Sequence, residues 1–419
     1  MKVLWITNIL LPEAEQLLTG RGDLKSSGGW LLGLAHALLG KDVSLTVATV
    51  SSKVRKLTRI EGQKVTYYVI PYGKGNTDIN LEYCDYWKHI HREVKPDITH
   101  LHGTEFSHGY AYVKAIGADN VVISIQGLAS AYYPYFCYGM SQRDIIRNLT
   151  FRDLFGGSVL QGKNNLRRRS KAEVALIKEA KYFIGRTSWD KSRVQAINRE
   201  SVYYFCNETL RDEFYGGEGW RFDQCDKYSI FLSQAYSPIK GLHQVLKAMP
   251  YVLRHYPETH ILIAGNDITK VDGIKDFLAL SGYGRYIRGL IREHNLHGKI
   301  HFTGALNASQ MKNEYLKSNV FICPSSIENS PNSLGEAQLL GVPCIASYVG
   351  GIPDMMRGNE DNLYRYEEID MLADKICQVF SKSDAQYDMR SIAHERHNPQ
   401  RNAEMQYDIY MDIMNKSNR

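Results

Sequence analysis

Two glutamates and one lysine in the second half of the chain are well suited to bind and transfer a polar group. Glu328 and Glu336 stand eight residues apart in the segment E-N-S-P-N-S-L-G-E. One carboxylate can accept hydrogen bonds from a sugar while the other accepts them from a ribose diol. Lys240, in S-P-I-K-G, adds a mobile ammonium that can neutralise a phosphate leaving group. Chance spacing and a solvated surface lysine are the plain structural alternatives.

Backbone groups at two expected helix starts offer further ligand contacts. The amides of Asn332, Ser333 and Leu334 lie where a helix begins, and such amides can hold an anion or a hydroxyl. Gly28 and Gly29 precede another expected helix and let the backbone approach a ligand closely. A tight turn without a ligand is the alternative for this glycine pair.

Strands that alternate with helices must position these residues. Short β-branched segments predict strands at residues 3–7, 43–49, 65–70, 98–102, 121–125 and 182–185 in the first half. The second half predicts strands at 228–233, 260–264, 299–302, 320–323 and 343–347, with helices between them. Residues 141–171 interrupt the pattern and are expected to be basic and loop-rich. The alternation indicates parallel, doubly wound sheets.

The pattern predicts an α/β protein with two Rossmann-like domains that face one another across a cleft. At roughly 100–200 residues per domain, a chain of 419 residues suits two domains. Glycines at positions 216, 217 and 219 mark a composition break, and the linker is expected in or just before it. We expect an N-terminal domain at 1–210, a C-terminal domain at 211–395, and a final helix at 396–419 that packs back on the first domain. Ligands in such sheets bind at the carboxyl ends of the strands.

Composition and charge exclude several classes of function. The seven cysteines are scattered without a C-x-x-C pair, which indicates reduced thiols in a cytosol and no zinc site. No apolar run approaches the roughly 20 residues of a membrane span, and the first residues are typical of a strand, not a signal peptide. The net charge of +6 suits an anionic small ligand or an anionic membrane surface. It is too weak to indicate nucleic acid, so we expect a cytoplasmic protein without a nucleic-acid partner.

Together these motifs resemble the family-four retaining glycosyltransferases of the GT-B fold. The resemblance covers nearly the whole chain and is most specific in F-L-S-Q-A-Y-S-P-I-K-G, I-L-I-A-G-N-D, I-H-F-T-G and N-V-F-I-C-P-S-S-I-E-N-S-P-N-S-L-G-E-A. It implies a nucleotide-diphosphate sugar donor bound mainly to the second domain and an acceptor bound mainly to the first. It also implies transfer of a hexosyl unit with retention of configuration, and no metal or other cofactor. The chain contains no D-x-D triplet.

The resemblance assigns roles to individual donor-site residues. Lys240 is expected to touch the donor diphosphate, Glu336 the ribose hydroxyls and Glu328 the donor hexose. Gly28 and Gly29 are expected to approach the donor phosphate and the acceptor. Phe302 and Gly304 are expected to lie near the nucleobase, through their backbone.

Three positions depart from the family pattern. The family usually has an arginine six residues before the lysine, where this chain has Gln234, and Arg186 is a candidate for the missing charge. Gln126 stands where the family often has a histidine, and a neutral amide can bind a sugar hydroxyl but cannot act as a general base. Pro331 replaces a frequent glycine and lacks an N–H group.

The acceptor side carries its own resemblance. The stretches H-L-H-G-T-E-F-S-H-G and S-I-Q-G-L-A-S are similar to a bacterial subgroup associated with surface-polysaccharide assembly. His102, Glu105, His108 and Gln126 are therefore candidates to bind a sugar or lipid-linked sugar acceptor, with hydrogen bonding at strand ends as the alternative.

The basic segment from Arg143 to Lys171 carries interspersed apolar residues, which favours peripheral contact with an anionic membrane. A solvated flexible loop is the alternative for this segment. With membrane contact, a cytoplasmic protein could work at the inner face of a membrane.

A second class of function stays open at this point. The same frame could be a catalytically degraded nucleotide-sugar-binding partner protein, because Gln234 and Gln126 remove an expected charge and an expected base. A dehydrogenase is more distant, since the chain lacks the G-x-G-x-x-G fingerprint. Turnover of a nucleotide sugar distinguishes the transferase from both.

Overall fold

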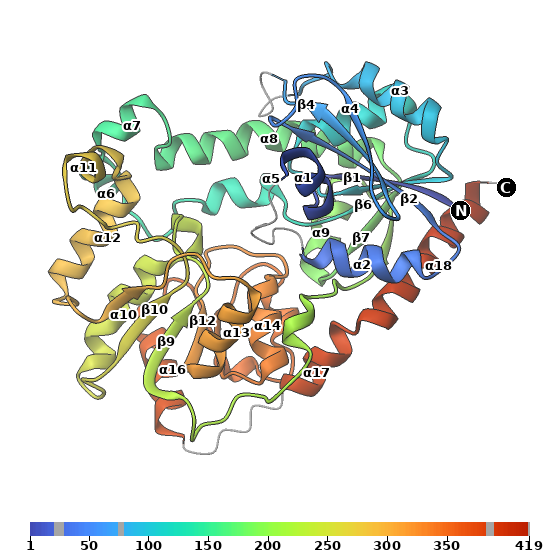
Figure 1. The fold of residues 1–419 in the computed structure, drawn as a ribbon. Coiled ribbons are helices and arrows are strands. Elements are labelled where there is room, and N and C mark those ends of the chain that lie inside the picture. Colours follow the sequence, from blue (N-terminus) through green and yellow to red (C-terminus); the bar gives the residue numbers. More distant parts are fainter. Residues whose placement is uncertain (21–28, 74–78, 383–388, 418–419) are drawn as a thin grey trace. The chain divides into compact units, whose positions relative to one another are not determined.

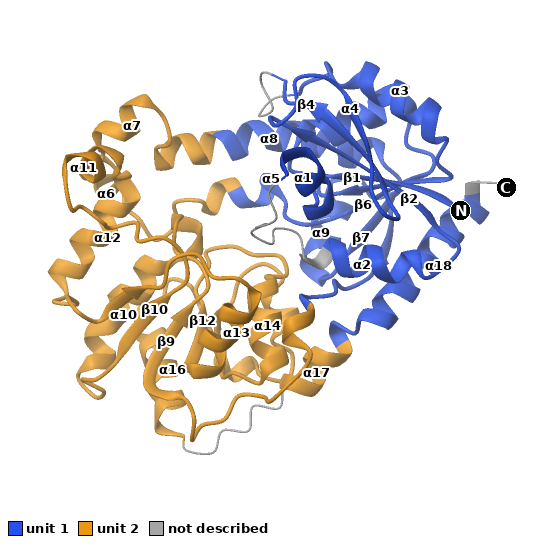
Figure 2. Cartoon of the chain, in the orientation of Figure 1, with its two compact units in different colours: residues 1–132, 165–211, 396–419 blue, residues 133–164, 212–395 orange. Residues whose placement is uncertain are grey.

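The computed structural model describes residues 1–20, 29–73, 79–382 and 389–417. By their contacts they form two compact units (Figure 2). Unit 1 comprises residues 1–132, 165–211 and 396–419, and unit 2 comprises residues 133–164 and 212–395. Residues 133–164, which lie inside the predicted first domain, group with unit 2, and Arg211 groups with unit 1.

Unit 1 is built on an eight-stranded sheet, counted over its described residues, in the order β3-β4-β2-β1-β5-β6-β7-β8 (Figure 1). Its strands are β1 (Lys2–Thr7), β2 (Ser44–Ser51), β3 (Thr58–Glu61), β4 (Thr66–Pro71), β5 (Ile98–His102), β6 (Val121–Ser124), β7 (Tyr182–Gly185) and β8 (Val202–Phe205). Neighbouring strands run parallel except β3 and β4. Strand β1 is buried on both faces, with Leu4 in one core and Trp5 in the other. Burial on both faces explains its continuous apolar sequence.

Helices cover both faces of this sheet. They are α1 (Pro12–Thr19), α2 (Gly29–Leu39), α3 (Cys84–Val94), α4 (Ser107–Ile116), α5 (Ala129–Tyr132), the C-terminal part of α8 (Val159–Glu179), α9 (Ser188–Ile197) and α18 (Pro399–Ser417). Helices α1, α2 and α18 share the core of Trp5, while α3, α4, α8 and α9 share the core of Leu4. Tyr410 of α18 accepts a hydrogen bond from Trp5 Nε1 at 3.0 Å and pairs with His100 Nδ1 at 2.6 Å. The last helix is therefore an integral part of unit 1.

Unit 2 is built on a six-stranded parallel sheet, again over its described residues, in the order β11-β10-β9-β12-β13-β14 (Figure 1). Its strands are β9 (Asp226–Leu232), β10 (His260–Ile263), β11 (Ile300–Phe302), β12 (Ser318–Cys323), β13 (Cys344–Ser347) and β14 (Leu363–Tyr364). One face packs against α10, α12 and α16 around Ile230 and Leu232. The other carries an aromatic cluster in which Phe231 and Phe321 contact Tyr315.

Several helical segments of unit 2 come from residues 133–164, well before its sheet in sequence. These are η1 (Tyr133–Tyr135), α6 (Gln142–Arg147), α7 (Phe151–Phe155) and the first turns of α8. The remainder are η2 (Asp212–Phe214), η3 (Pro238–Lys240), α10 (Leu242–Leu253), α11 (Ile274–Ala279), α12 (Gly282–Glu293), α13 (Ala308–Lys317), α14 (Asn332–Leu340), α15 (Ile352–Met355), η4 (Glu360–Asn362), α16 (Ile369–Ser381) and α17 (Met389–Arg396).

The predicted α/β class with two parallel, Rossmann-like sheets is confirmed, while the loop-rich prediction for residues 141–171 was wrong. That segment forms α6, α7 and most of α8. Ser141 begins α6 through a capping box with Asp144, and at the start of α7 Thr150 N donates to Asp153 Oδ2 at 3.0 Å. These side-chain bonds stabilise the starts of two short helices, and the apolar residues between them are too few to show a helical period.

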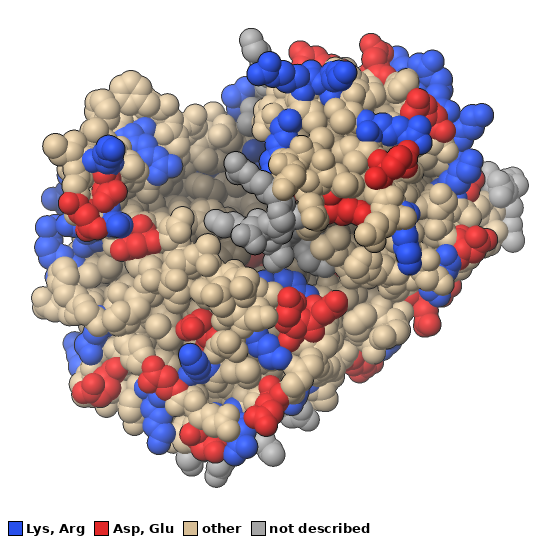
Figure 3. Space-filling model, in the orientation of Figure 1, with Lys and Arg blue, Asp and Glu red and all other residues tan. Residues whose placement is uncertain are grey.

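Charge on the surface is mixed. On the face drawn in Figure 3, Lys and Arg side chains are interspersed with Asp and Glu over both units. No helix among residues 1–20, 29–73, 79–382 and 389–417 is long and apolar enough to cross a membrane.

Candidate functional site

Lys240 and Glu328 lie where the strand order of the unit 2 sheet reverses. From β9 the chain moves outward through β10 and β11, then returns to place β12 on the other side of β9. The loops after β9 and β12 therefore leave neighbouring strands at the same edge, which is the position where open α/β sheets bind ligands. Lys240 comes from the first loop and Glu328 from the second.

These two side chains form an ion pair in a largely buried setting. Lys240 Nζ donates to Glu328 Oε1 at 2.5 Å, and Ser325 Oγ donates to the same oxygen at 2.9 Å. The side chain of Lys240 is 22% exposed and that of Glu328 10%. Burial lowers the pKa of Lys240, but the attraction of Glu328 outweighs it, so the pKa lies above the ordinary lysine value. The ammonium is therefore held charged at the strand ends.

Two glycines let the loops pack closely enough to make this pair. Gly241 has φ +74°, and a Cβ atom there would lie 1.7 Å from the carbonyl oxygen of Pro324. Gly350 has φ +54°, and a Cβ atom there would lie 1.8 Å from the carbonyl oxygen of Glu328. Both φ values lie in the left-handed region that glycine adopts most readily, and the short Cβ contacts exclude a larger residue at either position. Two hydrogen bonds also join these loops, from Ser326 N to Ile239 O at 2.9 Å and from Gly351 N to Glu328 O at 3.0 Å. We call the two close glycine contacts and these two hydrogen bonds the clamp.

Helix α14 begins in the same loop. Pro331 is its N-cap residue, so the missing N–H falls just outside the helix, and Leu334 N donates to Pro331 O at 3.0 Å. Asn332 and Ser333 supply the first helical amides, which an α-helix cannot satisfy within itself. Glu336 lies one turn further along and is 4% exposed. The loop that carries Glu328 therefore leads directly into the helix-start amides, and the buried carboxylate of Glu336 follows one turn later.

The remaining predicted donor residues of unit 2 lie at ends of β9 and β11. Gln234 is exposed, two residues after β9. Phe302 ends β11 and packs against the unit 2 core. The backbone of Gly304 pairs with Gly265 in both directions, at 2.9 and 3.1 Å. The Gly304 amide is thus already used within the protein, whereas its carbonyl oxygen keeps a second lone pair.

In unit 1 the strand order reverses between β1 and β5, and Glu105 lies there. Its carboxylate accepts hydrogen bonds from Asn8 Nδ2 at 3.1 Å and from Gly127 N at 3.0 Å. These partners follow β1 and β6, so the carboxylate connects three strand ends. Burial raises the pKa of Glu105, against the lowering effect of its hydrogen bonds and of Arg186.

The two predicted histidines are buried and neutral. Burial lowers the pKa of His102 to about 3 and that of His108 to about 4. The ring of His102 packs edge-on against Trp5, with ring centroids 4.5 Å apart, and its Nε2 has no protein partner within the described residues. A neutral imidazole nitrogen of this kind can exchange a hydrogen bond with a ligand or water.

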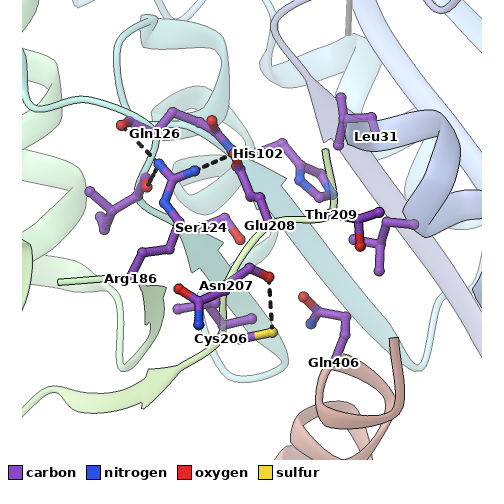
Figure 4. A pocket seen from close by; sticks show the side chains of 13 residues that line it. Leu31, His102, Ser124, Gln126, Arg186, Cys206, Asn207, Glu208, Thr209 and Gln406 are labelled. Carbon is purple, nitrogen blue, oxygen red and sulfur yellow. Dashed lines mark hydrogen bonds and ion pairs between the residues drawn. The ribbon is translucent and has the colours of Figure 1, made fainter. Parts of the chain in front are cut away.

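Gln126 and Arg186 belong to one hydrogen-bonded cluster in unit 1, shown in Figure 4. Gln126 Nε2 donates to Glu208 Oε1 at 2.8 Å, and the guanidinium of Arg186 forms an ion pair with Glu208. Arg186 also donates to the carbonyl oxygens of Ile125 and Gln126, at 2.9 and 3.1 Å. The cluster and His102 line a cavity of about 30 Å³. Arg186 is therefore engaged by internal partners at 6% exposure.

The structure thus gathers the predicted residues into two groups, one in each unit. Lys240 and Glu328 are in contact, and His102, Gln126 and Arg186 share one cavity. Gly28 lies outside the described residues, and Gly29 begins α2. Among residues 1–20, 29–73, 79–382 and 389–417, no group of three or more His, Cys, Asp or Glu could hold a metal ion.

Sequence reasoning missed Ser325, Asn8 and Glu208. Ser325 stands in P-S-S-I-E, three residues before Glu328, and this close spacing is a signal for its hydrogen bond to that glutamate. Asn8 and Glu208 belong to no motif. Their importance depends on which strand ends become neighbours.

Comparison with known proteins finds a family model that matches most of unit 2. Residues 220–396 match the family model described as Glycosyl transferases group 1. Two curated relatives match part of the chain. The gpi3 subunit of phosphatidylinositol N-acetylglucosaminyltransferase from Schizosaccharomyces pombe is 22% identical over 34% of this chain. The putative glycosyltransferase YtcC from Bacillus subtilis is 29% identical over 32% of it. This chain covers only 28% and 31% of the length of these relatives.

Solved structures match nearly the whole chain. Sucrose-phosphate synthase from Thermosynechococcus elongatus aligns with a TM-score of 0.70 at 16% identity, covering 99% of this chain and 100% of that one. HepE from Anabaena, solved in complex with UDP, aligns with a TM-score of 0.63 at 14% identity, covering 98% and 100%. Residues 220–396 therefore form a domain of the Glycosyl transferases group 1 family, within a chain that has the GT-B fold.

Proposed function

We propose that this protein is a retaining glycosyltransferase that moves a hexosyl unit from a nucleotide-diphosphate sugar to an acceptor hydroxyl. The observation that carries the proposal is the Lys240–Glu328 pair, which lies at the switch point of the unit 2 sheet beside the start of α14. The residues that make it fall within the segment that matches the group 1 family model.

The donor would bind along the strand ends of unit 2. Lys240 and the first amides of α14, at Asn332 and Ser333, would hold the diphosphate, because they offer a cation and a positive helix end. The Leu334 amide, which donates to Pro331 O at 3.0 Å, would join them only by giving up that partner. Glu336 would accept hydrogen bonds from the ribose, and Phe302 and Gly304 would border the base. HepE was solved with UDP, and a trehalose-6-phosphate protein from E. coli of similar fold with UDP-2-fluoro glucose. Uridine diphosphate sugars are therefore the first donors to test.

The chemistry would depend on charge at the leaving diphosphate. As the glycosidic bond breaks, negative charge grows on the departing phosphate, and Lys240 stabilises it from a fixed position. Glu328 keeps that ammonium charged, and its second oxygen would accept a hydrogen bond from a hexose hydroxyl. With retention, the acceptor would attack from the face that the diphosphate leaves, and the diphosphate would take its proton. No metal is needed in this scheme, because Lys240 and the helix amides supply the positive charge.

The acceptor would bind to unit 1, at the reversal of its strand order. His102, Gln126 and Glu105 are the candidates there, and His108 lies in the next helix. Glu105 and Gln126 could each accept a hydrogen bond from the attacking hydroxyl, but of these two only the carboxylate of Glu105 could act as a base. Arg186 would hold Gln126 in place through Glu208. A sugar or lipid-linked sugar acceptor, used in polysaccharide or glycolipid assembly at the inner face of a membrane, fits this proposal.

The test is donor hydrolysis and transfer by Glu328→Gln and Lys240→Ala, with Lys270→Ala as the matched control. Lys270 belongs to an exposed ion pair with Asp272 in the same unit. A panel of nucleotide sugars is first ranked by thermal shift on the wild type. Loss of a preorganised charge should cost about a hundredfold to a thousandfold in turnover for Lys240→Ala, with the control unchanged. Near-full activity in both site variants would end the proposal. Donor binding without turnover on any acceptor would point to a binding protein instead.

A further inference from the structure

Large apolar side chains are exposed together on two short helices of unit 2. In α7, Phe151 is 54% exposed, Leu154 74% and Phe155 78%. In α11, Ile274 is 81% exposed, Phe277 62% and Leu278 44%. The two helices are more than a hundred residues apart in sequence, and they occupy one corner of the unit in Figure 1. Contiguous exposed apolar surface of this kind marks an interaction site.

Polar contacts hold the two helices together while leaving these side chains outside. Arg152 Nη1 donates to Ala279 O at 3.2 Å, at the end of α11. Gly282 N donates to Asp153 Oδ1 at 3.4 Å, and Arg285 Nη1 donates to Leu149 O at 3.1 Å. The rings of Phe151 and Phe155 pack against each other, with centroids 4.8 Å apart. These contacts therefore fix the backbone of the two helices, and they leave the apolar side chains exposed.

The charge beside this surface is positive. Residues 141–164 and 266–293 carry nine Lys and Arg against six Asp and Glu. Asp144 and Asp153 accept hydrogen bonds at the starts of α6 and α7, and Asp272 pairs with Lys270, which leaves eight basic against five acidic side chains. Arg143 and Arg147 of α6 and Lys275 of α11 are exposed. In Figure 3 the atoms over α7 are mostly uncharged, with Lys and Arg close by and acids further along.

We propose that α7 and α11 form a docking surface for an anionic phospholipid bilayer. This α7–α11 surface consists of Phe151, Leu154, Phe155, Ile274, Phe277 and Leu278, with Arg143, Arg147 and Lys275 beside them. The apolar side chains enter the boundary between headgroups and acyl chains, and the basic side chains pair with lipid phosphates. Reversible attachment needs both contributions, because neither a few apolar side chains nor a modest positive charge holds a protein on a membrane alone.

This surface differs from the one expected from the sequence. The basic segment from Arg143 to Lys171 is divided between the two units, since residues 165–171 belong to unit 1. Within that part, the guanidinium of Arg169 lies over the ring of Phe106 at 4.5 Å. The structure instead brings α11, which lies outside the predicted basic segment, next to α7. The docking surface does not depend on the proposed transfer reaction.

The test is flotation of the full chain with vesicles of phosphatidylglycerol and phosphatidylcholine in equal parts, against vesicles of phosphatidylcholine alone. Two variants probe the surface: Leu154→Ser with Phe155→Ser, and Arg143→Glu with Arg147→Glu. Matched controls elsewhere in unit 2 are Tyr251→Ser with Met371→Ser, which are 46% and 39% exposed, and Arg254→Glu. Arg254 is also exposed and basic. Thermal unfolding and sedimentation are measured for every variant.

The wild type should float with the anionic vesicles and release as salt is added. The apolar variant should lose about a hundredfold in vesicle affinity, from two side chains kept out of the bilayer. The charge-reversed variant should lose about tenfold or more. Both controls should bind as the wild type does, and donor hydrolysis without lipid should be unchanged in all. Wild-type protein that stays with the unbound fraction, or surface variants that float like the wild type, would overturn the proposal. So would a wild-type dimer that only the apolar variant dissociates, since the surface would then be a protein interface.

Discussion

Substituting Lys240 and Glu328, singly and together, should lower the free energy of unfolding of unit 2. The two effects should not be additive. Lys240→Met keeps the aliphatic stem and removes the charge, and Glu328→Gln keeps the shape and removes the negative charge. Either change leaves the other side chain with its charge in a setting that is only 10–22% exposed. Ser325 Oγ still donates a hydrogen bond to the side chain at position 328, which reduces the stability lost when the lysine is replaced.

The size of the effect follows from burial. Removing one partner of a fully buried ion pair costs about 3–5 kcal/mol, because the remaining charge is left uncompensated. Lys240 keeps about a fifth of its side-chain surface, so water recovers part of that cost, and we expect about 2–3 kcal/mol for each single variant. The double variant buries no unpaired charge. Its loss should therefore be smaller than the sum by about 1–2 kcal/mol.

Alkaline pH provides an independent check on the same pair. The pKa of Lys240 in the folded state lies above its ordinary value, so the folded state binds its proton more tightly than the unfolded state does. The stabilisation is therefore fully present below the ordinary lysine pKa, and it is lost as pH rises through the raised value. The stability difference between the wild type and Lys240→Met should shrink over that range. Taking the difference removes the contribution of tyrosines, which titrate equally in both proteins.

Urea unfolding gives the global values, and hydrogen exchange gives the local ones. The amides of Ser326 and Gly351 are hydrogen-bonded inside the clamp, so their exchange should accelerate in both single variants. The exposed pair Lys270–Asp272 serves as a control cycle that should show no measurable coupling. A coupling below about 0.5 kcal/mol for Lys240 and Glu328, together with unchanged exchange at Ser326, would refute the reasoning.

Three other outcomes can be checked with single variants or additives. Gly241→Ala should destabilise unit 2 by about 2 kcal/mol or more in urea unfolding, because its φ is left-handed and its Cβ would lie 1.7 Å from the carbonyl oxygen of Pro324. Gly289→Ala is the control, because open space surrounds this position in α12, and it should stabilise unit 2 by about 0.5–1 kcal/mol. Glu208→Gln should lower the stability of unit 1 by about 3 kcal/mol, because it leaves the buried Arg186 charge unpaired. Adding Arg186→Met should restore part of the loss, and a double variant no more stable than Glu208→Gln alone would contradict this. Transfer activity should survive a chelator, and a loss that Mg²⁺ or Mn²⁺ restores would show that a metal takes part.

The architecture was predictable because strand burial leaves a local signal. In strands buried on both faces, such as β1 and β12, an apolar run fills most of the strand, at 3–6 and 320–323, and their expected positions match the structure closely. The missed strands β3, β8 and β14 show why other cases fail. Strand β3 pairs on one side at the sheet edge with an alternating pattern, and β14 is two residues long. Their pairing depends on neighbouring strands, which a local pattern does not contain.

The candidate site was predictable residue by residue but not as a set of contacts. Lys240 and Glu328 stood out because each follows an expected strand. Their contact spans 88 residues and exists because β12 returns to the side of β9. Glu208 shows the opposite case, since nothing in its local sequence marks it, and only the ends of β6, β7 and β8 together bring it to Arg186 and Gln126.

The pairing of Lys240 with Glu328 also constrains how a donor can bind. An ammonium has three donors, and the pair in the structure uses one of them. A diphosphate could therefore bind Lys240 without breaking the pair. The Glu328 carboxylate would then lie between the Lys240 ammonium, which it stabilises, and the hexose. Removing Glu328 would free the ammonium for the phosphate while loosening its position, which favours binding over turnover. Removing Lys240 would instead leave a buried carboxylate facing an anion, which opposes both. The two variants should therefore not be equivalent, because in the proposed reaction Lys240 would carry the charge that stabilises the leaving group and Glu328 would fix where that charge lies.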